Sequence, residues 1–321
     1  MPLTRNQIAS LLENKSIAAV RSWLKSLDLT HSANTKTELT ERVFGLLNEG
    51  ELTEEEFRRG LLSLEEASAK RVFLFGVECP ENADEHFLES LRRARVGLDD
   101  NPRLAPNLPR NPTLVYVTKH GRVIRAKWAE TQESVEPDIE RARFVRNKLT
   151  KVIVLIADLE ARTAQLRFDK PEAIHSYKDG DGNTDDNLFF GHYVNAAASL
   201  LGMNLAPTDV RSALRSLVET VPRIIRLESK DFRTGSNSRV RFSSKTDVRD
   251  DGDWQVMHAE GGDAWAYDRE FVHWLPATSD GRLSREVFTA IDGRTGKLRV
   301  EADCHEEELE YAISTIRAHQ S

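Results

Sequence analysis

The stretch SIAAVRSWLKSLDLTHSANTKTELTERVFGLL, residues 16–47, determines how the chain begins to fold. Apolar residues recur in it at three- and four-residue spacing in two groups, first Ile17, Val20, Leu24 and Leu27, then Leu39, Val43, Leu46 and Leu47. Residues at this spacing share one face of a helix, so the stretch predicts two amphipathic helices. Residues 30–36 between them are polar and rich in Ser, Thr and Asn, which predicts an extended connection.

The second helix carries its own start signal. Thr35 precedes it and Glu38 follows three residues later, which is the spacing of a capping box. Two short helices joined by an extended segment bury little surface alone, so we expect them to pack on another part of the chain. Trp23 lies off the main apolar face and is expected to pack against the next helix, residues 54–67.

These residues resemble the helix-extended-helix family, and within it the SAP motif of DNA-binding proteins. The matching positions are Val20, Leu24, Leu27 and Leu29 in the first half, and Lys36, Leu39, Arg42 and Val43 in the second. SAP motifs usually carry Gly two residues before the lysine, where this chain has Asn34, a residue that also tolerates a left-handed backbone. The resemblance implies DNA binding, although related helix-extended-helix modules bind proteins or RNA.

Five polar residues of this SAP-like module are candidates for phosphate contacts: Lys25, Thr35, Lys36, Thr37 and Arg42. Lys36 is expected in the first turn of the second helix, where free backbone amides also favour an anion. The other two cations would flank it, and the threonines offer hydroxyl groups. Glu38 and Glu41 lie close by and would oppose a phosphate.

Helical signals continue to about residue 68, and strand signals begin directly behind them. Thr53 and Glu56 form a second capping box. Residues 71–77, RVFLFGV, are apolar on both faces, which predicts a central strand. We therefore expect a helical SAP-like module at residues 1–68 and a larger body at residues 69–321.

The body predicts hairpins mixed with helices. Strands are expected near 113–118, 122–129, 151–156, 285–292 and 297–303, and helices near 84–98, 186–203, 207–221, 268–275 and 305–318. A proline-rich loop, residues 99–112, marks a candidate sub-boundary. This order predicts the α+β class with a mixed, mostly antiparallel sheet.

Composition restricts the class of protein further. The chain of 321 residues has two cysteines, far apart, which argues against a disulfide framework and for a reducing compartment. The first ten residues lack the apolar region of a signal peptide, and no apolar run reaches the roughly 18 residues that a membrane span needs. We expect a soluble cytoplasmic protein without a membrane partner.

Charge is unevenly distributed, although the net charge is −7. Residues 91–170 contain 17 Lys and Arg against 10 Asp and Glu, and residues 211–250 contain 10 against 5. If these two blocks meet in space, they form a central basic surface bounded by acidic segments. Solvated surface arginines that happen to cluster explain the same counts.

The second block contains a basic hairpin, residues 223–245, in which alternation separates apolar residues from arginines. Its candidate contacts are Arg226, Arg239 and Arg241 on the strands, Lys230 and Arg233 at the tip, and Lys245 after the second strand. An arginine-bearing ribbon of two strands suits a groove or a phosphate backbone. The alternative is the solvated outer face of an amphipathic hairpin.

A nuclease is the competing hypothesis. Glu228 and Lys230 follow a hydrophobic strand, like the second half of a PD-(D/E)xK site, where carboxylates hold Mg²⁺ and the lysine positions the nucleophile. The first half is missing, because Asp209, the nearest suitable upstream acid, opens a helix. The loop Asp179–Asp185 imitates the start of a calcium loop but lacks the later Gly and Glu, so we interpret it as an acidic turn. No metal or cofactor is expected.

The leading hypothesis is a non-catalytic DNA-binding protein. It would contact double-stranded DNA through the SAP-like module and the central basic surface, mainly by charge, so binding would fall with salt. The alternatives are a metal-dependent nuclease or other nucleic-acid enzyme, and a scaffold whose helical module binds a protein partner.

Overall fold

The computed structural model describes residues 3–13, 15–109, 112–138, 143–170, 186–233, 239–261, 266–300 and 304–320. Within these residues the chain forms nine α-helices and eleven strands, and every strand pairing with a defined register is antiparallel. The expected α+β class with a mostly antiparallel sheet is confirmed.

The chain divides into two compact units, each described here by itself. The first contains residues 1–66 and 75–206, and the second contains residues 67–74 and 207–321. The strand β1 (Lys70–Val77) contributes its first part to the second unit and its last part to the first. The predicted boundary at residue 68 lies near the point where the chain first enters the second unit, but the helices before it share a unit with residues 75–206, so the predicted body at residues 69–321 is divided between the two units.

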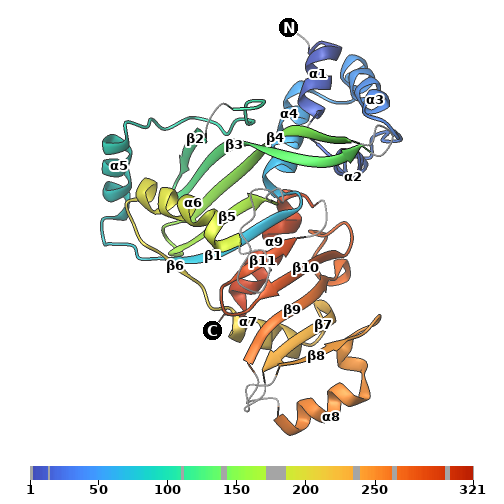
Figure 1. The fold of residues 1–321 in the computed structure, drawn as a ribbon, viewed down its shortest axis with the longest axis vertical. Helices are drawn as coiled ribbons and strands as arrows, with labels where there is room; N and C mark the ends of the chain where they lie inside the picture. Colours follow the sequence, from blue (N-terminus) through green and yellow to red (C-terminus); the bar gives the residue numbers. More distant parts are fainter. Residues whose placement is uncertain are drawn as a thin grey trace. The chain divides into compact units, whose positions relative to one another are not determined.

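Four helices form at the start of the chain, as Figure 1 shows: α1 (Arg5–Leu12), α2 (Ile17–Ser26), α3 (Lys36–Glu49) and α4 (Glu54–Ala67). Most of the apolar residues at helical spacing in the sequence face inward, but Leu27, just after the end of α2, is 44% exposed. Val20, Leu24, Leu39 and Val43 are fully buried in one cluster with Phe57 and Leu61 of α4. The helix-extended-helix segment therefore packs on another part of the chain, as expected.

The helix starts follow the capping signals closely. Thr53 and Glu56 bond reciprocally: each accepts from the other's backbone amide, at 2.9 and 3.2 Å. At the start of α3, the Thr35 hydroxyl accepts from the Glu38 amide at 3.2 Å. The Glu38 carboxylate, however, accepts from the amide of Asn34 rather than that of Thr35, at 2.7 Å, so it secures the extended segment one residue earlier.

Trp23 packs against α4, as the sequence predicts. Trp23 is 7% exposed, and the centroid of its ring lies 6.2 Å from the ring centroid of Phe57. Gly60 makes this contact feasible, because a Cβ there would lie only 2.1 Å from a carbon of the indole. Glycine lowers the helix propensity of α4, but its lack of a side chain lets the indole pack directly against the helix backbone.

The first unit continues with a meander of strands in the order β2, β3, β4 and β5, beside the last part of β1. Their bounds are Thr113–His120 for β2, Val123–Asp138 for β3, Arg143–Asp158 for β4 and Thr163–Asp169 for β5, and β6 (Leu205–Pro207) pairs with β1. Two helices accompany them, α5 (Ala83–Ala94) and α6 (Asp186–Leu201). Tyr193 of α6 lies edge-on to Trp128 and Phe168 on the strands.

The proline-rich segment 99–112 belongs to this unit. Arg103 donates to the carbonyl of Val115 on β2 at 2.8 Å, and the amide of Leu108 donates to the Thr150 hydroxyl on β4 at 2.8 Å. These bonds hold the described part of the segment, 99–109, to the sheet.

The second unit arranges its strands in the order β1, β11, β10, β9, β7 and β8. Their bounds are Ile225–Arg233 for β7, Arg239–Ser243 for β8, Ala266–Trp274 for β9, Val287–Asp292 for β10 and Lys297–Val300 for β11. The helices are α7 (Arg211–Glu219), α8 (Gly252–Gly261) and α9 (Glu306–Ala318), with short 3₁₀ turns at Val248–Asp250 and Pro276–Thr278.

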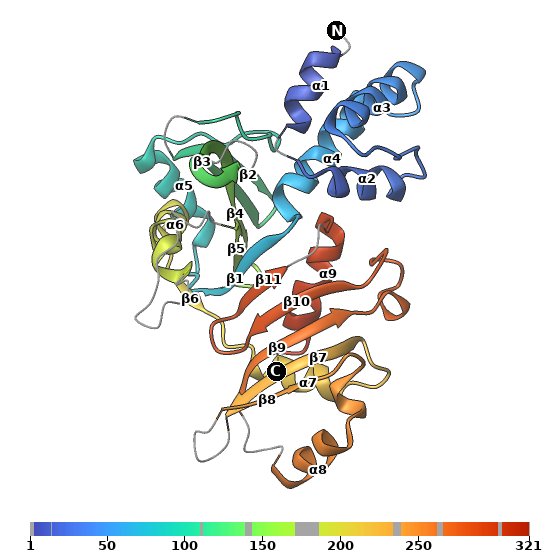
Figure 2. The ribbon, with the colours of Figure 1, turned by 45° about the vertical axis from the view of Figure 1, so that its right-hand side comes forward.

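The core of the second unit lies on one face of its sheet. Val72, Leu227, Val272, Trp274 and Ile291 on this face are buried against apolar residues of α7 and α9. Figures 1 and 2 both show these two helices against the same side of the strands β9 and β10.

One predicted element is wrong. The segment 268–275 forms the end of the strand β9, not a helix, and the helix of this region is α8. Val272 and Trp274 are buried while Phe271 and His273 are less so, which is the two-residue period of a strand. The abundance of Trp and charged residues around this segment hid that alternation.

Two glycines at helix interiors give a matched test of the Trp23 contact. We expect Gly60→Ala to destabilise the protein by about 1–3 kcal/mol, because overpacking against the indole outweighs the gain of about 1 kcal/mol in helix propensity. Gly45→Ala on α3, whose Cβ would meet nothing within 4 Å, should stabilise it by up to about 1 kcal/mol. Thermal unfolding followed by circular dichroism measures both, and a Gly60→Ala variant as stable as Gly45→Ala would contradict the contact.

Candidate nucleic-acid interface

Lys36, the central cation of the predicted SAP-like site, points into the protein. Its Nζ donates a hydrogen bond of 2.7 Å to the carbonyl of Leu12 at the end of α1. Burial lowers the pKa of Lys36, and the nearby positive charge of Lys15 lowers it further. The lysine therefore secures the end of α1, and its ammonium is already engaged there.

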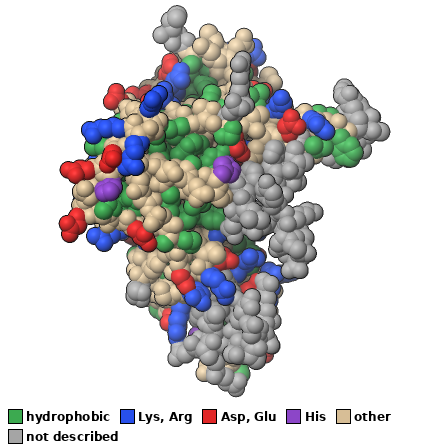
Figure 3. All heavy atoms as spheres, turned by 60° about the vertical axis from the view of Figure 1, so that its left-hand side comes forward, with side chains coloured by type: hydrophobic (Ala, Val, Ile, Leu, Met, Phe, Trp, Pro, Cys, Tyr) green, Lys and Arg blue, Asp and Glu red, His purple; other side chains and the backbone are tan. Residues whose placement is uncertain are grey.

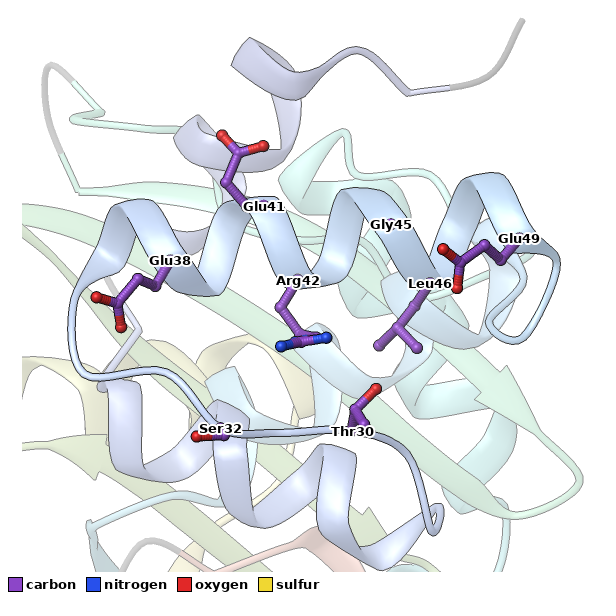
Figure 4. Close-up of a pocket in the computed structure, with 8 residues that line it drawn as sticks. All are labelled: Thr30, Ser32, Glu38, Glu41, Arg42, Gly45, Leu46 and Glu49. Atoms are coloured by element: carbon purple, nitrogen blue, oxygen red, sulfur yellow. The ribbon is translucent and has the colours of Figure 1, made fainter.

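A groove lies between α3 and the extended segment before it (Figure 4). Its volume is about 470 Å³, and its lining includes Arg42, Leu46 and the carboxylates of Glu38, Glu41 and Glu49. In Figure 4, Arg42 points toward the extended segment, whereas Glu41 points away from it. An anion entering the groove would meet one cation and several carboxylates.

The remaining SAP-like candidates are distributed around α2 and α3. Lys25 in the last turn of α2 and Thr37 in the first turn of α3 are exposed. Thr35 caps α3 with its hydroxyl. The structure thus leaves Lys25 and Arg42 as the exposed cations among the predicted contacts of this module.

Cations of the first basic block, residues 91–170, form ion pairs inside the first unit. Lys127 on β3 is fully buried, and its Nζ lies 2.8 Å from Glu65 and 2.5 Å from Glu66, both in the last turn of α4. Arg125 contacts Glu66 at 2.5 Å, and Lys15 contacts Glu65 at 2.8 Å. These cations hold the helices on the sheet. On the side of the first unit that Figure 3 displays, basic and acidic side chains are interspersed rather than gathered by sign.

The charges in this cluster stabilise one another strongly. Burial by itself would raise the pKa of Glu65, but the ammonium groups of Lys15 and Lys127 outweigh it and lower the pKa to about 2. Burial and the adjacent Glu66 carboxylate raise the pKa of Tyr116, whose hydroxyl donates to Glu66 at 2.8 Å. Glu65 is therefore held ionised and Tyr116 is held neutral.

The basic hairpin forms from β7 and β8, but a bulge changes which side chains face inward. The pairing of β7 with β9 shifts between Leu227 and Ser229, so that Glu228 is an extra residue in β7. A one-residue insertion moves every later side chain to the opposite face. Lys230, predicted at the exposed tip, is instead fully buried on the core face, because β7 continues to Arg233.

Lys230 pairs with Glu270 in this interior. The two residues are directly opposite on β7 and β9, both side chains are fully buried, and Nζ lies 3.5 Å from the carboxylate. The ammonium also lies 4.8 Å from the ring centroid of Trp254 on α8. Burial lowers the pKa of Lys230 and raises that of Glu270 to about 7, despite their mutual attraction.

The predicted nuclease pair is not brought together. The Glu228 carboxylate contacts Nε2 of His273 at 2.5 Å on the face opposite to the core, whereas Lys230 lies on the core face. No group of three His, Cys, Asp or Glu among the described residues could hold a metal ion. The loop Asp179–Asp185 lies outside these residues.

We call the side of the second unit's sheet opposite to its core the basic face. Residues that pair directly on neighbouring strands form three rows across this face. The first row is Arg226, His273 and Phe288, and the second is Ser243, Ser229, Phe271, Ala290, Arg299 and Arg71. The third row is Arg241, Asp231, Arg269, Asp292, Lys297 and Phe73. Six of these residues are Arg or Lys, and two are Asp. Three of the cations, Arg241, Arg269 and Arg299, are exposed.

The predicted hairpin cations differ in how they contribute to this face. Arg241 lies 5.2 Å from the Phe271 ring centroid and donates to Ser229 at 3.0 Å, yet its side chain remains 59% exposed. Arg226 contacts Glu286 at 2.8 Å. Arg233 and Arg239 pair across the hairpin, but their side chains lie outside the described residues. Lys245 is exposed beyond β8.

Sequence reasoning missed four of the six cations of the basic face. Arg269, Phe271 and His273 were assigned to a helix, and Arg299 lies on the far side of the sheet from the hairpin. The two-residue alternation of Phe271, Val272, His273 and Trp274 was the available signal, because it predicts a strand with Phe271 and His273 on one face and Val272 and Trp274 on the other.

Comparisons with known proteins add no assignment. No protein-family model matches the chain, and no curated protein matches it. Within the described residues, no helix is both long and apolar enough to cross a membrane.

The buried cluster at the end of α4 makes stability depend on pH. The folded pKa of Glu65, about 2, lies below its ordinary value of 4.5, so its contribution is present above pH 4.5 and is lost as the pH falls toward 2. We expect Glu65→Gln to cost about 3 kcal/mol at pH 7, and this cost should shrink through that interval. Urea unfolding at several pH values measures it. Glu55→Gln on the same helix, whose side chain is 82% exposed, should change stability by less than about 1 kcal/mol; an equal cost for both variants would contradict the assignment.

The Lys230 and Glu270 pair yields a different test. Lys230→Met leaves the Glu270 carboxyl buried without its cation and should cost about 3–5 kcal/mol at pH 8. The cost should grow as the pH rises above 7, because loss of the cation raises the pKa of Glu270 beyond its value of about 7 in the unmodified protein, and it should level off below pH 7, where Glu270 binds a proton in both proteins. The double variant Lys230→Met with Glu270→Leu should recover most of the stability. Urea unfolding again provides the measurement, and a double variant as unstable as the single one would show that the pair is not coupled.

Proposed function

We propose that this chain is a non-catalytic DNA-binding protein whose principal contact is the basic face of the second unit. The observation that carries this proposal is the exposure of Arg241, Arg269 and Arg299 on a side of the sheet opposite to the helices of its core. Guanidinium groups bind phosphate oxygens through paired hydrogen bonds, which suits them to a nucleic-acid backbone.

The arrangement of these arginines suits an extended polyanion. Arg241, Arg269 and Arg299 lie on β8, β9 and β11 of the order β11, β10, β9, β7 and β8. Since neighbouring strands lie about 4.8 Å apart, successive exposed arginines are separated by about 10 Å across the sheet. A compact anion would engage one of them, whereas a chain of phosphates can engage several.

Acidic groups on the same face limit the strength of the contact. Asp231 lies 3.5 Å from Arg241, and Glu286 pairs with Arg226. Binding should therefore be moderate and sensitive to salt. Lys25 and Arg42 of the SAP-like module would add a weaker contact, which gains from being on the same chain.

Variants that lose two arginines from the basic face should test the proposal. We expect Arg269→Gln with Arg299→Gln to weaken binding to a 20-base-pair duplex and to flatten the dependence of log K on log salt by about 0.9 for each lost phosphate contact. Fluorescence anisotropy titrations at several salt concentrations give both quantities. The proposal fails if the unmodified protein binds neither this duplex nor its separated strands at micromolar concentration and low salt.

Two further variants with the same loss of charge serve as controls. Arg59→Gln with Arg93→Gln removes two exposed arginines of α4 and α5, which lie in ion pairs within their helices, and should leave binding nearly unchanged. Lys25→Gln with Arg42→Gln measures the SAP-like module and should have an intermediate effect. Equal effects of all three variants would mean that net charge, and not the basic face, determines binding.

A further inference from the structure

Two phenylalanines occupy the middle of the basic face. Phe271 on β9 and Phe288 on β10 are partly exposed, and neither belongs to the hydrophobic core of the unit. Their ring centroids lie 6.5 Å apart with an angle of 25° between the ring planes. His273 lies 4.9 Å from Phe288, so three rings adjoin one another on these strands.

Cations border these rings on more than one side. Arg241 lies over Phe271. Arg226 is directly opposite His273 in the strand register, but both pair with Glu286, and Glu228 contacts the other ring nitrogen of His273, so the stronger cationic border is at Phe271. Arg299 follows in the same row as Phe271, two strands away. Aromatic rings flanked by cations form the combination that binds unpaired bases, because bases stack on rings and on guanidinium planes while phosphates bind the charges.

The shape of this face is unsuitable for reading bases in a duplex. Six strands at about 4.8 Å spacing make a sheet about 24 Å wide, and Phe271 and Phe288 lie on its two central strands. The major groove of DNA is about 12 Å wide and admits a helix or a ribbon of two strands. Paired bases cannot reach the central rings of so wide a face, whereas the bases of a single strand can lie flat on them.

We propose that the basic face binds single-stranded nucleic acid, with bases stacked on Phe271 and Phe288 and phosphates on the surrounding arginines. This inference rests on the proposed function and narrows its ligand. Stacking is largely independent of salt, and phosphate contacts are not. The effects of the two kinds of residue should therefore differ in a salt titration. Loss of arginines should change the slope of log K against log salt, whereas loss of phenylalanines should lower the affinity equally at every salt concentration.

The test uses the full chain and three fluorescein-labelled probes: a 20-nucleotide oligo-dT strand, a 20-nucleotide oligo-rU strand and a duplex DNA of 20 base pairs. We expect at least one single strand to bind more tightly than the duplex. Phe271→Leu with Phe288→Leu, which retains apolar volume but removes the rings, should weaken binding to that single strand by about 5-fold to 100-fold without changing the salt slope. The pair Phe271→Tyr with Phe288→Tyr should retain most of the affinity, because the rings remain.

A matched control is available on the first unit. Phe144 on β4 is 75% exposed, and Phe144→Leu should leave binding to every probe unchanged. Circular dichroism melting of each variant establishes that it is folded. Duplex binding as tight as or tighter than single-strand binding, or leucine variants that bind the single strand like the unmodified protein, would overturn this inference while leaving the proposed DNA binding in place. Absence of binding to all three probes would overturn both.

Discussion

The first unit depends on the requirement that buried charges have partners. Glu65 and Glu66 end α4 in the interior, and Lys15, Arg125 and Lys127 reach them from a helix connection and from β3. Removing either carboxylate leaves the three cations with a single negative partner in a region of low dielectric, which costs more than an exposed ion pair contributes. The N-terminal helices and the sheet are therefore joined by electrostatics as well as by the apolar cluster around Val20, Leu24 and Phe57.

In the second unit, the first of two irregularities in the pairing of β7 with β9 determines which charged groups are buried together. Without the bulge at Glu228, strict alternation would place Lys230 on the face of Arg226, where the nuclease motif would need it. With the bulge, the lysine enters the core opposite Glu270, and burial shifts both groups toward their neutral forms. Glu228 and Lys230 thus lose the common face that a metal-dependent site requires, and Arg241 on β8 remains exposed.

Local signals in the sequence predicted local structure well. The capping residues Thr35 and Thr53, the packing of Trp23 on α4 and the α+β class are all borne out. The predictions that failed concern features that depend on residues far away in the sequence. The residues of β7 do not indicate the bulge, because a bulge is defined by the pairing with β9. The residues near Lys127 do not indicate that its ion-pair partners lie about sixty residues upstream. Counts of charge along the chain therefore overestimated the basic surface of the first unit and missed Arg269 and Arg299 in the second.

The basic face concentrates its outward charge and its exposed rings on the same strands. On the side of a sheet that faces water, polar residues such as Ser or Thr would be sufficient to keep β9 and β10 hydrated. Phe271 and Phe288 instead expose part of two rings to water, at a cost in transfer free energy that packing against one another offsets only in part. The Arg241 guanidinium lies 5.2 Å from the centroid of the Phe271 ring, and its side chain remains 59% exposed. An aromatic surface maintained beside cations is better explained by a ligand with flat rings and negative charge than by stability of the fold, and a nucleic-acid strand has both properties in every residue.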